Sequence, residues 1–282
     1  MARTRRLSGV ALTILAACAL LGTIVPTAAG STVSRSTPSS AHAGQQSSQP
    51  GDYLSLGDSV PFGFSPFPNR DYPVSFPDLV AGSLHLRLVN AACPGETTTR
   101  LIGREQPRPR GCDTSARSPH VNYPGSQLEY AISYLRSHPR TGLVTLMVGA
   151  NDLFASASPQ QGLQTVRQNL TVILSAIRHH YRGPLVVVTY YSTDYRNRTF
   201  SAITRELNAV IGAEARHVGA AVADGYRAFA LVSSVSPRRG DPCAAGLLIH
   251  LTRQICDNHP TPLGAAVLAL TVDAAFRDEG RR

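Results

Sequence analysis

The 282-residue sequence contains no lysine and no tryptophan, so every one of its 27 basic residues other than histidine is arginine. Complete exclusion of lysine is typical of codon bias in a GC-rich genome, which makes the net charge of +9 weak evidence for a nucleic-acid partner. Nucleic-acid binding also calls for clustered cations interleaved with aromatic side chains. The arginines form only one loose cluster, which consists of Arg104, Arg108, Arg110 and Arg117. We therefore expect no nucleic-acid ligand.

Charged residues are also few, at 16%, whereas 43% of the residues are hydrophobic, which excludes intrinsic disorder of the whole chain. The first residues are typical of an export signal, because Arg3, Arg5 and Arg6 precede an uncharged apolar stretch over residues 10–25. That stretch is shorter than the roughly 20 residues of a membrane-spanning helix. We therefore predict a cleaved signal peptide over residues 1–29 and a secreted protein. Lipoprotein anchoring at Cys18 is the alternative, although the residues after Cys18 remain apolar.

Export places the remaining cysteines in an oxidising compartment. Four follow the signal, and none forms a CxxC pair, so disulfides are expected and a metal site is not. Four cysteines allow three pairings. Short local loops favour Cys93 with Cys112 and Cys243 with Cys256.

The chain after the signal divides into a linker and one domain. Residues 30–51 are rich in Ser, Gln and Pro and predict a flexible linker, and residues 52–282 predict a single folded domain. Within that domain, short apolar runs alternate with longer helical patterns, which indicates an α/β fold with a parallel sheet buried on both faces. The expected strands are Tyr53–Leu56, Leu86–Val89, Leu143–Val148, Leu185–Thr189 and Ala220–Ala223, and the expected helices include Gly125–Ser137, Gln160–His180, Ser201–Val218 and Pro262–Phe276.

Four polar motifs lie where chemistry is expected in such a fold. Gly57-Asp58-Ser59, residues 90–96 and residues 149–152 follow the first three expected strands, and residues 257–260 precede the last helix. Ligands of open parallel sheets bind at the carboxyl ends of the strands. Any one motif is ordinarily a turn or a helix cap. Together they supply a hydroxyl nucleophile, backbone and amide donors and an imidazole base, which predicts nucleophilic catalysis.

The same motifs resemble a known family. The segments LSLGDSVPFGF, NAACPGETT, VGANDLF and DNHPTPLGA are similar, in order and spacing, to the four sequence blocks of the SGNH (GDSL-type) hydrolases, in particular to secreted actinobacterial esterases and lipases. This resemblance implies a three-layer α/β/α fold with a flavodoxin-like sheet. It also implies that Ser59 is the nucleophile and His259 the general base, and that Gly95, Asn151 and the Ser59 N–H form the oxyanion hole.

One position departs from the family pattern. The family places an aspartate three residues before the catalytic histidine, and this sequence has Cys256 there. Either Asp257, two residues before His259, completes a catalytic triad, or a backbone carbonyl near Cys256 orients the imidazole of a Ser–His dyad. The short reach of a side chain at the second position favours the carbonyl.

We expect a secreted, monomeric serine esterase or lipase that needs no cofactor and acts on small-molecule or lipid esters. The alternative is a non-catalytic protein of the same fold that binds the cell envelope. The segment after Cys93 carries Arg100, Arg104, Arg108 and Arg110, and an ordinary solvated loop is the favoured interpretation. If the segment instead borders the site, it would allow peripheral contact with an envelope or membrane surface and favour anionic substrates. No long apolar insertion is present to form a lid, which favours soluble short- to medium-chain esters. Phe62, Phe64 and Phe67 either line an acyl pocket or belong to the core.

Overall fold

The computed structural model describes residues 51–67, 74–105, 112 and 118–281. The expected signal peptide, Cys18 and almost all of the linker lie outside these residues, as do Arg108, Arg110 and Arg117. Among the helices in the described part of the chain, none combines the length and the apolar character that a membrane span requires.

A five-stranded parallel sheet forms the centre of the domain, with strand order β2-β1-β3-β4-β5. Every residue of the strands β1 and β4 is buried, because helices cover both faces of the sheet. The predicted parallel sheet is confirmed, and each expected apolar run overlaps a strand. The bounds are β1 (Asp52–Gly57), β2 (Arg87–Asn90), β3 (Thr141–Met147), β4 (Leu185–Val188) and β5 (Ala221–Ala223).

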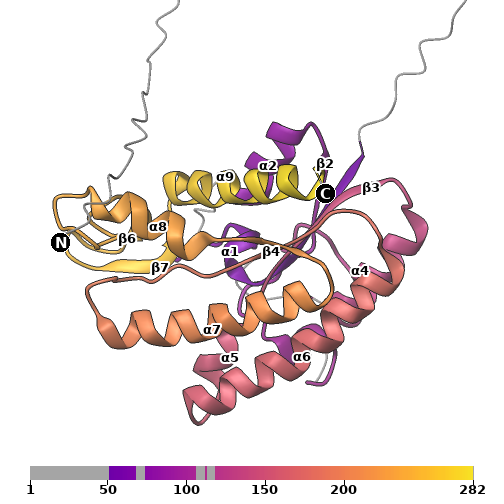
Figure 1. Cartoon of the computed structure of the whole chain (residues 1–282), viewed down its shortest axis with the longest axis horizontal. Helices are drawn as coiled ribbons and strands as arrows, with labels where there is room; N and C mark the ends of the chain where they lie inside the picture. The colour runs from indigo at the N-terminus through magenta and orange to yellow at the C-terminus, as the bar shows by residue number, and fades with distance from the viewer. Residues whose placement is uncertain (1–50, 68–73, 106–111, 113–117, 282) are drawn as a thin grey trace, which may run out of the picture. The chain divides into compact units, whose positions relative to one another are not determined.

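Helices form a layer on each side of this sheet, which confirms the three-layer α/β/α fold. The helices α2 (Phe76–Leu84), α8 (Gly225–Ser234) and α9 (Pro262–Glu279) lie on one side (Figure 1). The helices α4 (Gln127–Ser137), α6 (Pro159–His180) and α7 (Arg198–His217) lie on the other.

Local sequence explains where the main helices begin. A capping box starts α4, because Ser126 accepts from the Glu129 N–H and the Glu129 carboxylate accepts from the Ser126 N–H. The helix α6 starts with a Ser158 cap followed by proline, and Asn197 caps α7 three residues earlier than the apolar pattern predicts.

Short elements at the carboxyl edge of the sheet carry the polar motifs. The single-turn helices α1 (Ser59–Phe62), α3 (Thr98–Leu101) and α5 (Ala150–Ala155) follow β1, β2 and β3. An antiparallel hairpin of β6 (Leu248–His250) and β7 (Cys256–Pro260) precedes α9. The sequence does not predict this hairpin, because its strands are short and β7 lacks an apolar alternation.

Two disulfides brace the loops around this edge. Cys93 is bonded to Cys112, and both residues are fully buried beside the loop that follows β2. Cys243 is bonded to Cys256, the first residue of β7. These are the local pairs expected from the sequence, and the second one anchors the strand that holds His259.

Replacing both Cys243 and Cys256 with serine is expected to lower the free energy of unfolding by about 3 kcal/mol, because the disulfide restricts the unfolded chain. Urea denaturation of the variant and the wild type measures this difference. An unchanged midpoint would contradict the prediction. So would a stoichiometric free thiol in denatured, unreduced wild-type protein that begins after residue 29.

Candidate active site

A sharp turn at the end of β1 presents Ser59. Gly57 has φ = +135°, and a Cβ atom there would lie 2.0 Å from the carbonyl oxygen of Met147, so only glycine fits. Asp58 caps α1 by accepting a hydrogen bond from the Val60 N–H at 3.0 Å. Ser59 is therefore the first helical residue after the strand, and its hydroxyl lies at the carboxyl edge of the sheet.

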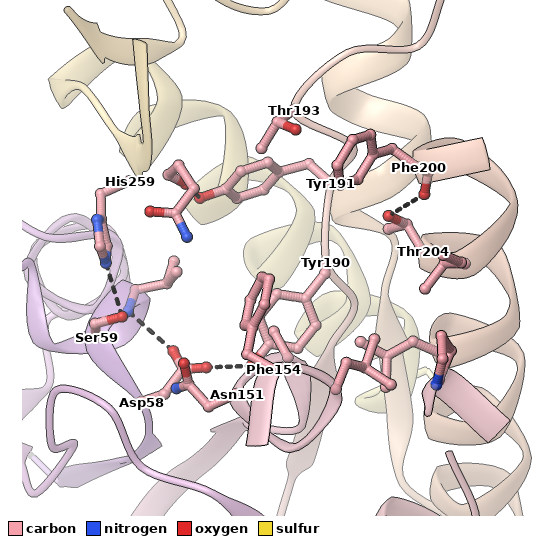
Figure 2. Close-up of a pocket in the computed structure, with 17 residues that line it drawn as sticks. Asp58, Ser59, Asn151, Phe154, Tyr190, Tyr191, Thr193, Phe200, Thr204 and His259 are labelled. Atoms are coloured by element: carbon pink, nitrogen blue, oxygen red, sulfur yellow. Dashed lines mark hydrogen bonds between the residues drawn. The ribbon is translucent and has the colours of Figure 1, made fainter. Parts of the chain in front are cut away.

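His259 lies between the Ser59 hydroxyl and a carboxylate. Its Nε2 atom is 2.8 Å from Ser59 Oγ, and its Nδ1 atom is hydrogen-bonded to Oδ1 of Asp257 (Figure 2 shows the serine–histidine pair). With the proton on Nδ1, the imidazole donates to Asp257 and offers Nε2 as an acceptor to Ser59. The three side chains thus form one hydrogen-bonded chain across residues that are 200 positions apart in sequence.

The partner of His259 Nδ1 is the Asp257 carboxylate and not a backbone carbonyl near Cys256, which the sequence favoured. Its Oδ1 atom also accepts a hydrogen bond from the backbone N–H of His259 at 2.9 Å. The carboxylate therefore folds back along the strand and contacts both the backbone and the imidazole of His259. Burial acts to raise the pKa of Asp257, but the hydrogen bonds and the charge of His259 together outweigh it and hold that pKa below its ordinary value. Asp257 is therefore ionised at neutral pH.

The three hydrogen-bond donors expected in an oxyanion hole are the N–H groups of Ser59 and Gly95 and the side-chain amide of Asn151. Gly95 has φ = +71° in the loop between β2 and α3, and Asn151 is the second residue of α5. The side-chain amide of Asn151 donates one hydrogen bond to the Glu96 carbonyl at 2.9 Å, which ties α5 to the Gly95 loop. Within the described residues, no protein group accepts a hydrogen bond from the N–H of Ser59 or of Gly95. Both remain available to a negatively charged oxygen.

Asp152 fixes the relative position of these loops. It is buried, and its carboxylate accepts hydrogen bonds from the backbone N–H of Thr98 at 2.9 Å and from the Thr98 hydroxyl. Asn169 of α6 donates to that same hydroxyl at 3.0 Å. The helices α3, α5 and α6 are thereby joined beneath the site.

A cleft of about 470 Å³ opens beside Ser59 (Figure 2). Its walls come from α5, from α7 and from the segment that follows β4. Phe154 and Phe200 stand at its surface, 76% and 57% exposed. The lining is mainly apolar and aromatic, and it includes Val60, Leu153, Phe154, Pro159, Tyr190, Tyr191, Phe200, Ile203 and Leu207.

The cleft is not built from the phenylalanines considered in the sequence. Phe62 is buried against the ring of His120, and the Phe64 ring packs on His259 with ring centroids 4.7 Å apart. Neither these two residues nor Phe67 lines the cleft. The residues that do line it come from α5, from the amphipathic helix α7 and from the segment after β4, and their pattern in the sequence does not separate them from core residues.

A buried tyrosine–aspartate pair lies behind Ser59. The phenol of Tyr190 donates a hydrogen bond to Oδ2 of Asp58, a residue that is only 2% exposed. Burial raises the pKa of Asp58 to about 6. Because folding raises this pKa from 3.8 to about 6, the free energy of unfolding falls as the pH increases through this range. Above pH 6, ionised Asp58 therefore destabilises the folded protein. Sequence reasoning missed this pair, because only the fold brings its members together.

Two other features of the sequence acquire a clear environment. The Arg100 guanidinium donates to the Gly95 carbonyl at 2.8 Å and pairs with Glu105 at 2.9 Å, so much of its charge is balanced locally. In the described part of the chain, one group of three side chains has donor types suited to a metal ion: Cys243, His250 and Cys256. Its two sulfur atoms are bonded to each other, which leaves no thiolate for a metal.

Solved structures of esterases share this fold. An acetylxylan esterase, Axe2 from Geobacillus stearothermophilus, matches 80% of this chain and 94% of its own, with TM-score 0.56 and 16% identity. LAE5, an α/β hydrolase from the metagenome of Lake Arreo, matches 80% and 95% with the same score and identity. A lipolytic G-D-S-L family protein from Veillonella parvula matches 80% and 98%, with TM-score 0.53 and 14% identity. No curated protein sequence matches the chain significantly.

The structural matches, at 14–16% identity, show the fold, whereas the amino-acid sequence shows the family. The profile of the GDSL-like lipase/acylhydrolase family matches residues 55–267, which include the Ser59 turn, the Asn151 helix, the cleft and the His259 strand. A match over most of the described domain shows family membership. The chain therefore belongs to the GDSL-like lipase/acylhydrolase family and is an ester hydrolase.

Proposed function

We propose that the protein is a secreted serine esterase that cleaves carboxylic esters of small to medium acyl chains, with Ser59 as nucleophile and His259 as general base. The observation that carries this proposal is the hydrogen-bonded chain from Asp257 through His259 to Ser59 at the side of an apolar cleft. A protein that only binds the cell envelope has no need of such a chain.

Acylation begins when Ser59 Oγ attacks the ester carbonyl carbon while His259 Nε2 takes the serine proton. Ionised Asp257 stabilises the imidazolium that forms and keeps it oriented. The carbonyl oxygen becomes an oxyanion, which the N–H groups of Ser59 and Gly95 and the Asn151 amide stabilise. When the tetrahedral intermediate collapses, the ester bond breaks and the leaving alcohol takes the proton from His259. An acyl group then remains on Ser59.

Deacylation reverses these roles with water as the nucleophile. His259 Nε2 takes a proton from the water as its oxygen attacks the acyl carbon, and the same donors stabilise the second oxyanion. Collapse releases the carboxylic acid and returns the proton to Ser59 Oγ. The balanced reaction consumes one water for each ester cleaved.

The cleft provides the acyl specificity in this proposal. Its volume falls within the range of small-molecule sites, and aromatic and aliphatic side chains dominate its walls. Each methylene group buried there stabilises the bound ester by about 0.8 kcal/mol. A hexanoyl or octanoyl group therefore gains from the cleft, whereas an acetyl group reaches little of it. This preference differs from the acetyl esters named for the Axe2 structure.

Filling the cleft tests this specificity. In Ile203→Trp, the larger ring on α7 is expected to lower kcat/KM for p-nitrophenyl octanoate by roughly tenfold or more, because about two methylene groups lose their burial. Activity on the acetate is expected to change little. Leu231→Trp on the exposed face of α8, outside the cleft, serves as the matched control. An unchanged ratio of octanoate to acetate activity in Ile203→Trp would contradict an acyl role for the cleft.

Secretion is supported by the signal-like N-terminal sequence and by the two disulfides. The length and charge pattern of residues 1–29 are those of a cleaved export signal. N-terminal sequencing of protein recovered from the culture medium tests this part of the proposal.

A further inference from the structure

The Tyr190–Asp58 pair joins the segment after β4 to the turn that presents Ser59. The Asp58 carboxylate accepts from the Tyr190 phenol through Oδ2 and from the Val60 N–H through Oδ1 at 3.0 Å. In Figure 2 the Tyr190 ring lies across the floor of the cleft with its phenol directed at Asp58, directly below Ser59. Tyr190 therefore holds the residue that caps the nucleophile turn.

Tyr190 is itself held firmly from two sides. The Asn208 side chain of α7 accepts from the Tyr190 N–H at 2.8 Å and donates to its carbonyl at 2.7 Å. The phenol also faces the backbone of Ala150, the first residue of α5, and both residues line the cleft. Ala150 directly precedes Asn151, so one phenol group faces both the nucleophile turn and the first residue of α5.

We propose that Tyr190 is a positioning residue, which holds the Ser59 turn in place relative to the Asn151 helix by binding the Asp58 carboxylate beside the start of α5. This inference rests on the proposed function of Ser59 and Asn151. An oxyanion hole built from two separate elements works only when both keep their spacing, since a small misplacement of a donor lowers the rate strongly. Among the described residues, neither disulfide joins these two elements.

The charge on Asp58 adds a second contribution. The titratable groups facing Asp58 are Tyr190 and Tyr191 after β4, His259 on β7 and Asp152 on α5. Ionised Asp58 is attracted to His259 when the imidazole carries a proton, which is the state formed during ester cleavage. The Tyr190 hydrogen bond favours the ionised carboxylate and so opposes the effect of burial on its pKa.

Tyr190→Phe separates this role from the acyl pocket, because it removes the phenol oxygen and keeps the ring in the cleft wall. We expect kcat for p-nitrophenyl butyrate at pH 8 to fall roughly ten- to a hundredfold, the usual effect of losing a hydrogen bond to a charged group, with KM changed less than about twofold. Tyr134→Phe is the matched control. Its buried phenol donates to the Asp52 carboxylate at the opposite end of β1 and should leave kcat unchanged.

The pH profile distinguishes positioning from mere loss of stability. Without its tyrosine, the pKa of Asp58 rises, so the acid limb of kcat moves to higher pH in Tyr190→Phe and stays in place in Tyr134→Phe. Asp58→Asn cannot ionise at this position. Adding Tyr190→Phe to Asp58→Asn should therefore cause no further movement of the limb. If Tyr190→Phe fails to fold in thermal unfolding, Asp58→Asn alone carries the test through a lowered kcat.

The results of these experiments distinguish failure of this inference from failure of the proposed function. An active wild type whose Tyr190→Phe variant keeps both kcat and the acid limb would overturn this inference and leave the proposed function standing. If Tyr190→Phe fails to fold, an Asp58→Asn variant with wild-type kcat would do the same. A wild type that hydrolyses no ester and does not react with a serine-directed phosphonate would overturn the proposed function itself.

Discussion

Ser59→Ala is expected to lower kcat/KM for ester hydrolysis by on the order of 10⁴-fold or more while leaving the fold intact. Alanine removes the oxygen that attacks the ester, and no other hydroxyl lies within hydrogen-bonding distance of His259 Nε2 among the described residues. The turn itself should persist, because Gly57 and the Asp58 cap, rather than the serine side chain, shape it.

The measurement is hydrolysis of p-nitrophenyl esters by the purified variant, alongside its thermal unfolding. Ser137→Ala is a matched control, since this exposed serine at the end of α4 bonds only to its own helix and to the adjacent His138. A correctly folded Ser59→Ala protein that keeps more than about a tenth of the wild-type activity would refute the nucleophile assignment.

Asp257→Asn should lower kcat by on the order of 10⁴-fold, the loss typical when the carboxylate of a catalytic triad becomes an amide. An asparagine amide can donate to Nδ1, which favours the imidazole tautomer with its proton on Nε2. That tautomer cannot accept the proton of Ser59. The main-chain position of His259 should change little, because the amide oxygen can still accept the His259 N–H.

This variant also separates the two arrangements that the sequence left open. If a backbone carbonyl near Cys256 orients His259, the loss of the Asp257 charge has a small effect, and a drop of less than about tenfold in a folded variant would establish the dyad. Asp278→Asn, an exposed carboxylate near the end of α9, is the control for removal of one negative charge.

Local patterns in the sequence were sufficient for the fold class and for the Gly57-Asp58-Ser59 turn. Residues 185–188 are apolar throughout because helices cover both faces of the sheet, so that no side chain of this strand faces water. The glycine and aspartate before Ser59 are needed for one tight turn, so they remain adjacent in the chain and readable there. The local cysteine pairs follow the same logic, since loops of 19 and 13 residues close easily.

Only the tertiary structure decided the features that depend on distance through space. The Asp257 carboxylate reaches His259 because β7 is extended and its side chain folds back on the strand, a conformation that residue spacing does not reveal. Tyr190 meets Asp58 across 132 positions of sequence, and the cleft joins α5 to α7. Periodicity describes how one segment meets the core, whereas these contacts arise from how separate segments pack against each other. The sequence therefore determined the residue types of the candidate site, and the packing of α5, α7 and β7 determined their partners and the shape of the site.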